Sequence, residues 1–159
     1  MSLDDWLLAL HVLSAAAFVA GLVVFWVVIV AARSMDTPRE TLRLGPLTTI
    51  AEATLGTGAL GTIVLGIWLA LSLGGYDLWD GWIIAAIVLW VIAMGLGQRT
   101  NAAYGPAVKK AMELQAAGQT GPSAELLALN RTSAGLVMQS LASVVVLLIL
   151  IDMIAKPGA

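Results

Sequence analysis

The sequence contains no cysteine, and this absence excludes several kinds of site at once. Without a thiol the chain can form no disulfide, bind no iron–sulfur cluster and build no cysteine-based zinc site. Charge is also scarce, because only 11% of the 159 residues are Asp, Glu, Lys or Arg, against about 25% in soluble domains. With 60% hydrophobic residues, the composition argues against a soluble domain and against a nucleic-acid partner.

The few charges leave four long runs without any formal charge, at residues 6–32, 53–76, 81–98 and 132–151. These runs hold 27, 24, 18 and 20 residues, and a helix that crosses the hydrocarbon core of a bilayer needs about 20. None of them shows the alternation of a barrel strand. The sequence therefore predicts an all-α fold, an integral membrane four-helix bundle in one domain with the lipid bilayer as its surroundings.

Local signals set the expected ends of the helices. Thr37, followed by Pro38 and Glu40, predicts a capping box at the start of a short surface helix. The pair Gly105-Pro106 is expected to bend or restart the third long helix. We expect long helices at about 5–33, 46–73, 80–104 and 123–154, the surface helix at 38–44 and a further helix at 106–117.

The basic residues are distributed unevenly along the chain. Seven of the eight lie in segments 33–52 and 99–131, and the eighth is Lys156. Because cytoplasmic loops are enriched in Lys and Arg, both segments are expected in the cytoplasm. The termini and loop 74–80 then face outward, an N-out, C-out arrangement in a bacterial inner membrane, with helix 106–117 as a cytoplasmic extension. An aromatic belt is expected at the outer interface from Tyr76, Trp79 and Trp82.

Two of the long helices carry small or polar residues at intervals of four. The second has Thr54, Gly58, Thr62 and Gly66, and the fourth has Gln139 and Ser143. Residues four apart share a helix face, and small residues there let another helix approach closely, while polar side chains bond across helices. The same residues would also suit a groove for a flat ligand or a polar lining for a small one.

Charged groups near the cytoplasmic ends of the helices suggest an ion pair. Glu52 lies about one turn inside the second long helix, and Arg99 and Arg131 are expected at a similar depth. Because an unpaired carboxylate there is costly, we expect Glu52 to pair with one of these arginines. A proton-handling role is the alternative. No catalytic set of residues is predicted.

The only histidine, His11, lies about a turn and a half inside the outer end of the first helix. Its neighbours Ser14, Ala15 and Phe18 form a face of small residues with one aromatic ring, against which a haem could lie with the imidazole as axial ligand. Ligation by two histidines would need a dimer; otherwise the iron is five-coordinate or takes a residue such as Met153. The alternative is a buried neutral histidine that bonds to a carbonyl or a serine.

Three pieces of the sequence carry a resemblance: LHVLSAAAFVAG in the first helix, and the later GIWLA and DGWIIAA. They resemble a bacterial family of predicted four-helix integral membrane proteins without an assigned function. The first-helix pattern is also similar to the copper-resistance D-type membrane proteins and the HemJ-type protoporphyrinogen oxidases. In those groups an early first-helix histidine is associated with haem or metal handling, and only His11 carries over. The intramembrane lysine of the HemJ-type enzymes and the His/Met cluster of the copper group have no counterpart in this sequence.

Two functions of different classes follow from these features. One is binding of b-type haem, or of another apolar redox ligand, near His11. The other is a non-catalytic accessory subunit that packs, in a homodimer or a larger membrane complex, through its Gly/Thr face. Transport of a small neutral molecule along the lining formed by Thr54, Gln139 and Ser143 is a third.

The topology can be tested with single cysteines, since the chain has none of its own. Cysteines at Ser2 and Gln119 should react with an impermeant reagent from opposite sides of the membrane, because the positive-inside rule places these positions on opposite faces. Labelling of both from the same side in intact cells would contradict the orientation and the number of spans together.

Overall fold

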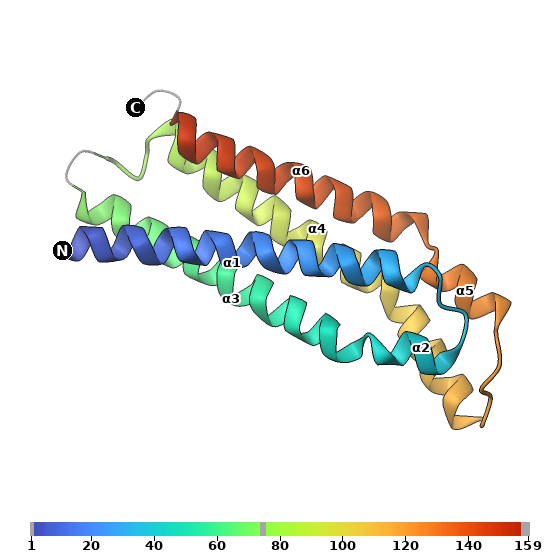
Figure 1. The fold of residues 1–159 in the computed structure, drawn as a ribbon. Helices are drawn as coiled ribbons and strands as arrows, with labels where there is room; N and C mark the ends of the chain where they lie inside the picture. The colour runs from blue at the N-terminus through green and yellow to red at the C-terminus, as the bar shows by residue number, and fades with distance from the viewer. Residues whose placement is uncertain (1, 74–75, 157–159) are drawn as a thin grey trace.

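The computed structural model describes residues 2–73 and 76–156, and all its regular structure in these ranges is helical, without a strand. Positions 74 and 75 of the expected outer loop lie outside the described residues. Figure 1 labels the six helices, which are α1 Leu3–Ala32, α2 Pro38–Arg43, α3 Gly45–Ser72, α4 Gly81–Ala116, α5 Ala124–Asn130 and α6 Ser133–Ala155.

The long helices associate as two pairs. α1 packs along α3 and α4 packs along α6, whereas contacts between the pairs are far fewer (Figure 1). The start of α1 and the end of α6 lie at one end of the bundle, which we call the terminal end, and α2 and α5 lie at the opposite end. Space left between the two pairs is therefore where a ligand site has to be sought.

Four helices are long and apolar enough to cross a membrane, as the charge-free runs predict. Large apolar side chains are exposed along all four, for example Leu13, Leu71, Val91 and Leu147. Moving such side chains into the protein interior gains little free energy when the surroundings are lipid tails, because the tails are equally apolar. The exposed apolar surface is thus the one expected for a multi-pass membrane protein.

Side-chain caps fix the starts of two helices. At α1 the Ser2 hydroxyl accepts from the Asp5 amide at 3.2 Å and the Asp5 carboxylate accepts from the Ser2 amide at 2.7 Å. At α2 the Thr37 hydroxyl accepts from the Glu40 amide at 3.4 Å, which confirms Thr37 as the cap. The Glu40 carboxylate, however, accepts from the Thr37 hydroxyl at 2.8 Å and not from a backbone amide.

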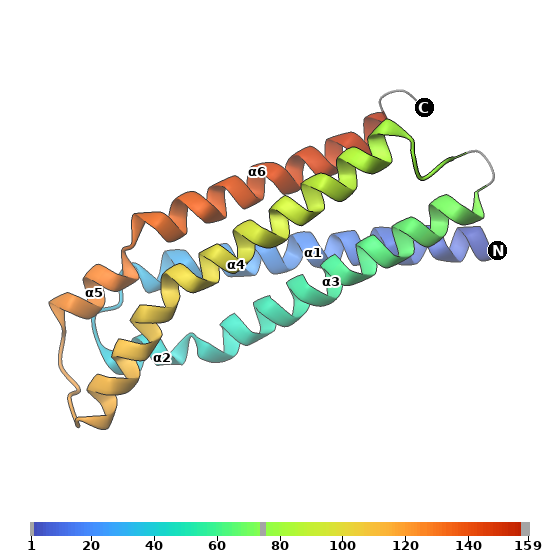
Figure 2. The same ribbon diagram turned by 180° about the vertical axis from the view of Figure 1, so that it is seen from behind.

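Gly105-Pro106 is expected from the sequence to bend or restart the third long helix, and the restart, with separate helices at 80–104 and 106–117, is wrong because α4 continues through both residues to Ala116. Proline removes one backbone hydrogen bond and crowds the carbonyl four residues earlier, which bends a helix more readily than it ends one when packing supports both sides. Figure 2 shows that α4 changes direction in its yellow-to-orange part. Beyond the bend, Ala107 and Ala111 are buried in a cluster with Leu126 of α5.

The expected single helix 123–154 is also wrong, because it is split into α5 and α6 at Arg131 and Thr132. Polar contacts with the 33–41 region hold this break. Asn130 Nδ2 donates to the Met35 carbonyl at 2.9 Å and to the Thr41 hydroxyl at 3.0 Å. Arg131 Nε donates to the Arg33 carbonyl at 2.9 Å. These bonds orient α5 toward α2 and α4 rather than along the axis of α6.

The close approach of α1 and α3 depends on glycine, since a Cβ at Gly58 would lie 2.7 Å from Phe18 Cα and 2.9 Å from the Ala17 carbonyl carbon. Gly58→Ala should therefore destabilise the protein by about 1–3 kcal/mol, because backbone atoms cannot rotate away. Gly56 lies in the same helix, and no described residue comes within 4 Å of such a Cβ there, which makes Gly56→Ala the matched control. Equal thermal stability of the two variants in detergent would contradict the observed packing.

Candidate functional site

His11 of α1 is held against α3 by one hydrogen bond, and it can come close to α3 because Gly66 has no side chain. Its Nδ1 lies 3.0 Å from the Thr62 carbonyl oxygen. The imidazole rests on Gly66, where a Cβ would come within 2.9 Å of His11 Cε1. Glycine at position 66 is thus what allows the ring to reach a carbonyl on the neighbouring helix.

This contact sets the tautomer of the ring. A carbonyl oxygen only accepts, so the proton of the neutral imidazole must lie on Nδ1. Nε2 then carries the lone pair, and it makes no hydrogen bond within the described part of the chain. Metal-binding histidines characteristically donate their second ring nitrogen to a carbonyl or carboxylate in this way. The geometry therefore fits both interpretations of His11, a structural bond to a carbonyl and a ligand atom left free.

His11 lines a cavity of about 400 Å³ between the two helix pairs near the terminal end, which we call the His11 cavity. Its wall is mostly apolar and comes from α1, α3, α4 and α6. Met153 lies on the same wall, so the structure brings together the histidine and the methionine that the sequence offered as axial ligands. The wall includes Leu8, Val12, Ala15, Ile63, Ile67, Ile83, Ile87, Trp90, Ile149 and Leu150.

The other residues proposed to accompany His11 are placed differently from one another. Ala15 lines the His11 cavity. Ser14 instead faces Gly61 of α3, where an added Cβ would meet its hydroxyl. Phe18 is 6% exposed and belongs to a central apolar cluster with Ala59, Ala93, Val146 and Ile149. Only Ala15 therefore accompanies His11 at the cavity, while Ser14 and Phe18 contribute to helix packing.

The small-residue face of α3 is covered by α1. Gly58 lies against the backbone of Phe18 and Gly66 against His11, and Thr62 bonds along its own helix to the Gly58 carbonyl at 2.7 Å. Thr54, which begins the row, is half-buried. Because this face serves packing within the chain, an accessory subunit would have to use another surface for its partner.

The polar pair on α6 has two separate roles. Ser143 accepts from the indole N–H of Trp26 on α1 at 2.8 Å, a cross-helix bond of the expected kind. Gln139 is 2% exposed and its Nε2 has no hydrogen-bond partner in the described residues. It lines a second cavity, of about 260 Å³, together with Gln98, Asn101 and Glu52.

The expected ion pair of Glu52 is wrong. Glu52 is exposed and accepts from Asn101 Nδ2 at 2.7 Å, whereas Arg131 binds the Arg33 carbonyl. Arg99 and Asn101 are two positions apart on α4, so they point to different sides of the helix. The side of α4 that faces α3 carries the Asn101 amide. Within residues 2–73 and 76–156 the one salt bridge joins Lys110 to Glu125 at 2.6 Å.

A third cavity, of about 720 Å³, was not anticipated from the sequence. It lies at the opposite end of the bundle from the His11 cavity and shares Phe25, Glu52 and Asn101 with the cavity of Gln139. Its lining comes from α1, α2, α3, α4 and Asn130, which are far apart in the sequence and are brought together only by the fold. Over the described residues, no group of three or more His, Asp or Glu side chains is placed to hold a metal ion.

Four helices that are long and apolar enough to span a membrane, with large apolar side chains exposed along them, define a multi-pass integral membrane protein. Residues 5–157 match the family described as predicted integral membrane protein (DUF2269), and the chain belongs to that family. The match covers nearly all of the chain and agrees with the resemblance to a four-helix membrane family. Neither a curated protein nor a solved structure matches the chain.

The bond between Trp26 and Ser143 crosses from one helix pair to the other, so it should contribute measurably to stability. In a double-mutant cycle of Trp26→Phe and Ser143→Ala we expect a coupling energy of about 0.6 kcal/mol, the average for such bonds in membranes. Trp68 is exposed on α3, and Trp68→Phe with Ser143→Ala serves as the control pair, with no coupling expected. Equal coupling in both cycles would exclude a specific bond.

Proposed function

We propose that this protein binds an apolar redox ligand in the His11 cavity, and that the ligand is b-type haem held by the Nε2 atom of His11. The observation that supports the proposal most directly is the contact between Nδ1 and the Thr62 carbonyl. It orients the ring, places the proton on Nδ1 and leaves a lone pair on the nitrogen that a metal would need.

The residues of the cavity fit such a ligand. Apolar walls from four helices would enclose the porphyrin ring and keep water from the iron. Met153 of α6 would be the second residue to hold the iron, through its thioether, and ligation by histidine and methionine raises the reduction potential of haem. When bound, haem supplies one-electron redox chemistry. His11 would fix its position, and the apolar wall would favour the less charged form of the iron.

The placement of the protein in the cell is part of the same proposal. We infer a bacterial inner membrane, with the terminal end facing outward and α2 and α5 on the cytoplasmic side, because seven of the eight basic residues lie between positions 33 and 131. The His11 cavity would then be near the outer surface, and the part of α4 beyond Pro106 would extend into the cytoplasm.

The test is the visible spectrum of the full-length protein purified from cells supplied with a haem precursor. The parent should show a Soret band, and His11→Ala should lose it, because alanine offers no axial ligand. Added imidazole should restore the band in His11→Ala if the cavity is intact. Leu10→Ala, next to His11 but exposed and off the cavity wall, is the matched control and should keep the band.

Thermal unfolding of each variant separates loss of ligand from loss of fold. Absence of a Soret band in the folded parent would refute haem binding and leave His11 as a structural residue. The accessory-subunit function would then lead, and its evidence would be a larger membrane protein that co-purifies at a fixed ratio.

A further inference from the structure

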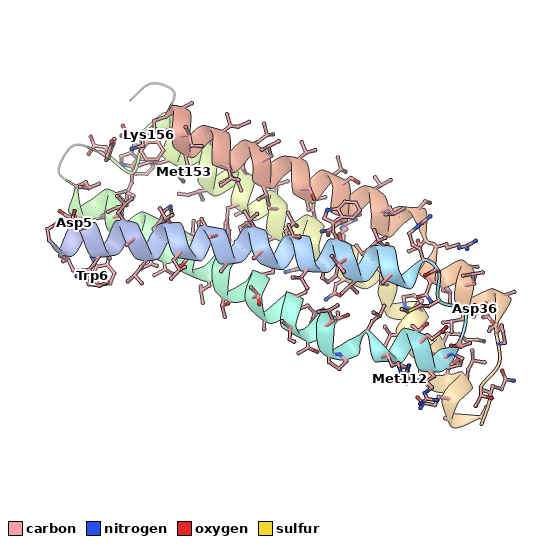
Figure 3. The ribbon with its side chains drawn as sticks, viewed as in Figure 1. Asp5, Trp6, Asp36, Met112, Met153 and Lys156 are labelled. Atoms are coloured by element: carbon pink, nitrogen blue, oxygen red, sulfur yellow. The ribbon has the colours of Figure 1, made fainter. Side chains whose placement is uncertain are left out.

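The polar groups of the His11 cavity are concentrated at the terminal end of the bundle. Tyr76, Trp82 and Lys156 line the cavity there, while the other described residues of the wall are apolar apart from His11 and Thr62. Figure 3 shows Lys156 and Met153 together at the end of α6, far from Asp36 and Met112 at the other end. A ligand in this cavity would therefore meet apolar side chains along its body and hydrogen-bond donors at its outer end.

Trp82 supplies a donor that lacks an acceptor. The residue is 7% exposed, and its indole Nε1 is buried without a hydrogen-bond partner among the described residues. Buried donors in native proteins are nearly always paired, and leaving one unpaired is unfavourable. By contrast, the other indole on this wall, Trp90, donates to the Ala59 carbonyl at 3.1 Å. The Trp82 indole is thus a donor for which a ligand could provide the acceptor.

Lys156 supplies a positive charge at the same place. It ends α6 with a left-handed backbone (φ 40°), and its ammonium donates to the Tyr76 hydroxyl at 3.0 Å. The ammonium also lies 4.7 Å from the centre of the Tyr76 ring and 5.4 Å from that of Trp82. An ammonium has three N–H groups, so two remain for another partner.

Five acidic residues lie at this end, and none of them lines the cavity: Asp4, Asp5, Asp77, Asp80 and Asp152. No carboxylate in the described ranges forms a salt bridge with Lys156. Asp152, one turn earlier on α6, is not part of the cavity wall, and the Asp4 carboxylate accepts from the Ser72 hydroxyl. Tyr76, Trp82 and Lys156 therefore form a rim at the mouth of an apolar cavity, and this rim carries hydrogen-bond donors and the positive charge of Lys156.

We infer that this rim recognises the carboxylate of an amphipathic ligand whose apolar body lies in the His11 cavity. One carboxylate oxygen would accept from Lys156 and the other from Trp82, and the Tyr76 hydroxyl holds the ammonium in place. The inference rests on the proposed use of the His11 cavity as a ligand site. Two sources share this chemistry, the propionate of a porphyrin and a long-chain fatty acid from the membrane.

Paired probes that differ only in the carboxylate test the inference on the full-length protein in phosphatidylcholine nanodiscs. One pair is haem and haem dimethyl ester, followed by Soret titration. The other is oleate and oleyl alcohol, followed by native mass spectrometry. The parent should bind the carboxylate member of a pair at least about tenfold more tightly, the size expected for a hydrogen bond to a charged group.

Three variants identify the group responsible for the preference. Lys156→Gln should abolish it and Lys156→Arg should retain it, because arginine keeps the charge and the donors. Lys109 is an exposed lysine of α4 at the end of the bundle away from Lys156. Lys109→Gln is therefore the matched control and should behave as the parent. Thermal unfolding of all three confirms that differences in binding are not differences in folding.

The outcomes separate this inference from haem binding. A preference for oleate that depends on Lys156, without a Soret band, supports carboxylate recognition with a fatty acid as the source and refutes haem. A Soret band with equal affinity for haem and its ester supports haem and overturns the inference. A preference that survives Lys156→Gln also overturns it. Failure to bind any of the four probes refutes both.

Discussion

Glycines bring α1 and α3 into close contact, and this contact determines both the packing of the first helix pair and the position of His11. Gly21 lies against the backbone of Leu55, where a Cβ would come 2.6 Å from the amide nitrogen, and Gly58 lies against the α1 backbone at Phe18. Gly66 lies against the imidazole of His11 instead. In lipid the association of helices relies on close packing and on hydrogen bonds, because apolar burial gives little difference between lipid and protein. The same approach brings His11 to the Thr62 carbonyl, so helix packing and the state of the imidazole have one cause.

The second pair of helices is joined to the first more loosely. Between α1 and α6 the indole of Trp26 donates to Ser143, and between α4 and α3 the indole of Trp90 donates to Ala59. The central cluster around Phe18 fills the space at mid-depth. Cavities remain between the pairs toward both ends of the bundle, and the one lined by His11 is the site for which we propose a ligand.

Much of the fold could be predicted because a bilayer imposes simple requirements on a sequence. Four charge-free runs were enough to indicate four spanning helices, and the spacing of Gly58 and Gly66 indicated a packing face. The identity of the helix on that face could not be read from the sequence, since any neighbour satisfies small residues equally well.

Features that depend on rotation about a helix axis or on a distant contact were not predictable. Whether Arg99 or Asn101 faces Glu52 depends on the exact orientation of α4 beside α3. The break at Arg131 and Thr132 arises from bonds that Asn130 and Arg131 make about 90 to 100 positions away in the chain. Trp82 looked like an interfacial anchor but is buried, while Trp79, three positions earlier, is 85% exposed. That Trp82 lines the His11 cavity becomes visible only in the folded structure.

Nitrogen-15 NMR of the imidazole in bilayers reports the protonation state proposed for His11, because the chain holds one histidine and gives one pair of ring signals. The proposed site requires a neutral ring with the proton on Nδ1, hydrogen-bonded to a carbonyl, and an unprotonated Nε2 in the protein without ligand. Addition of a ligand that uses the lone pair should then shift the Nε2 signal and leave the Nδ1 proton in place. A proton on Nε2, or a charged imidazolium at neutral pH, would contradict the proposed site.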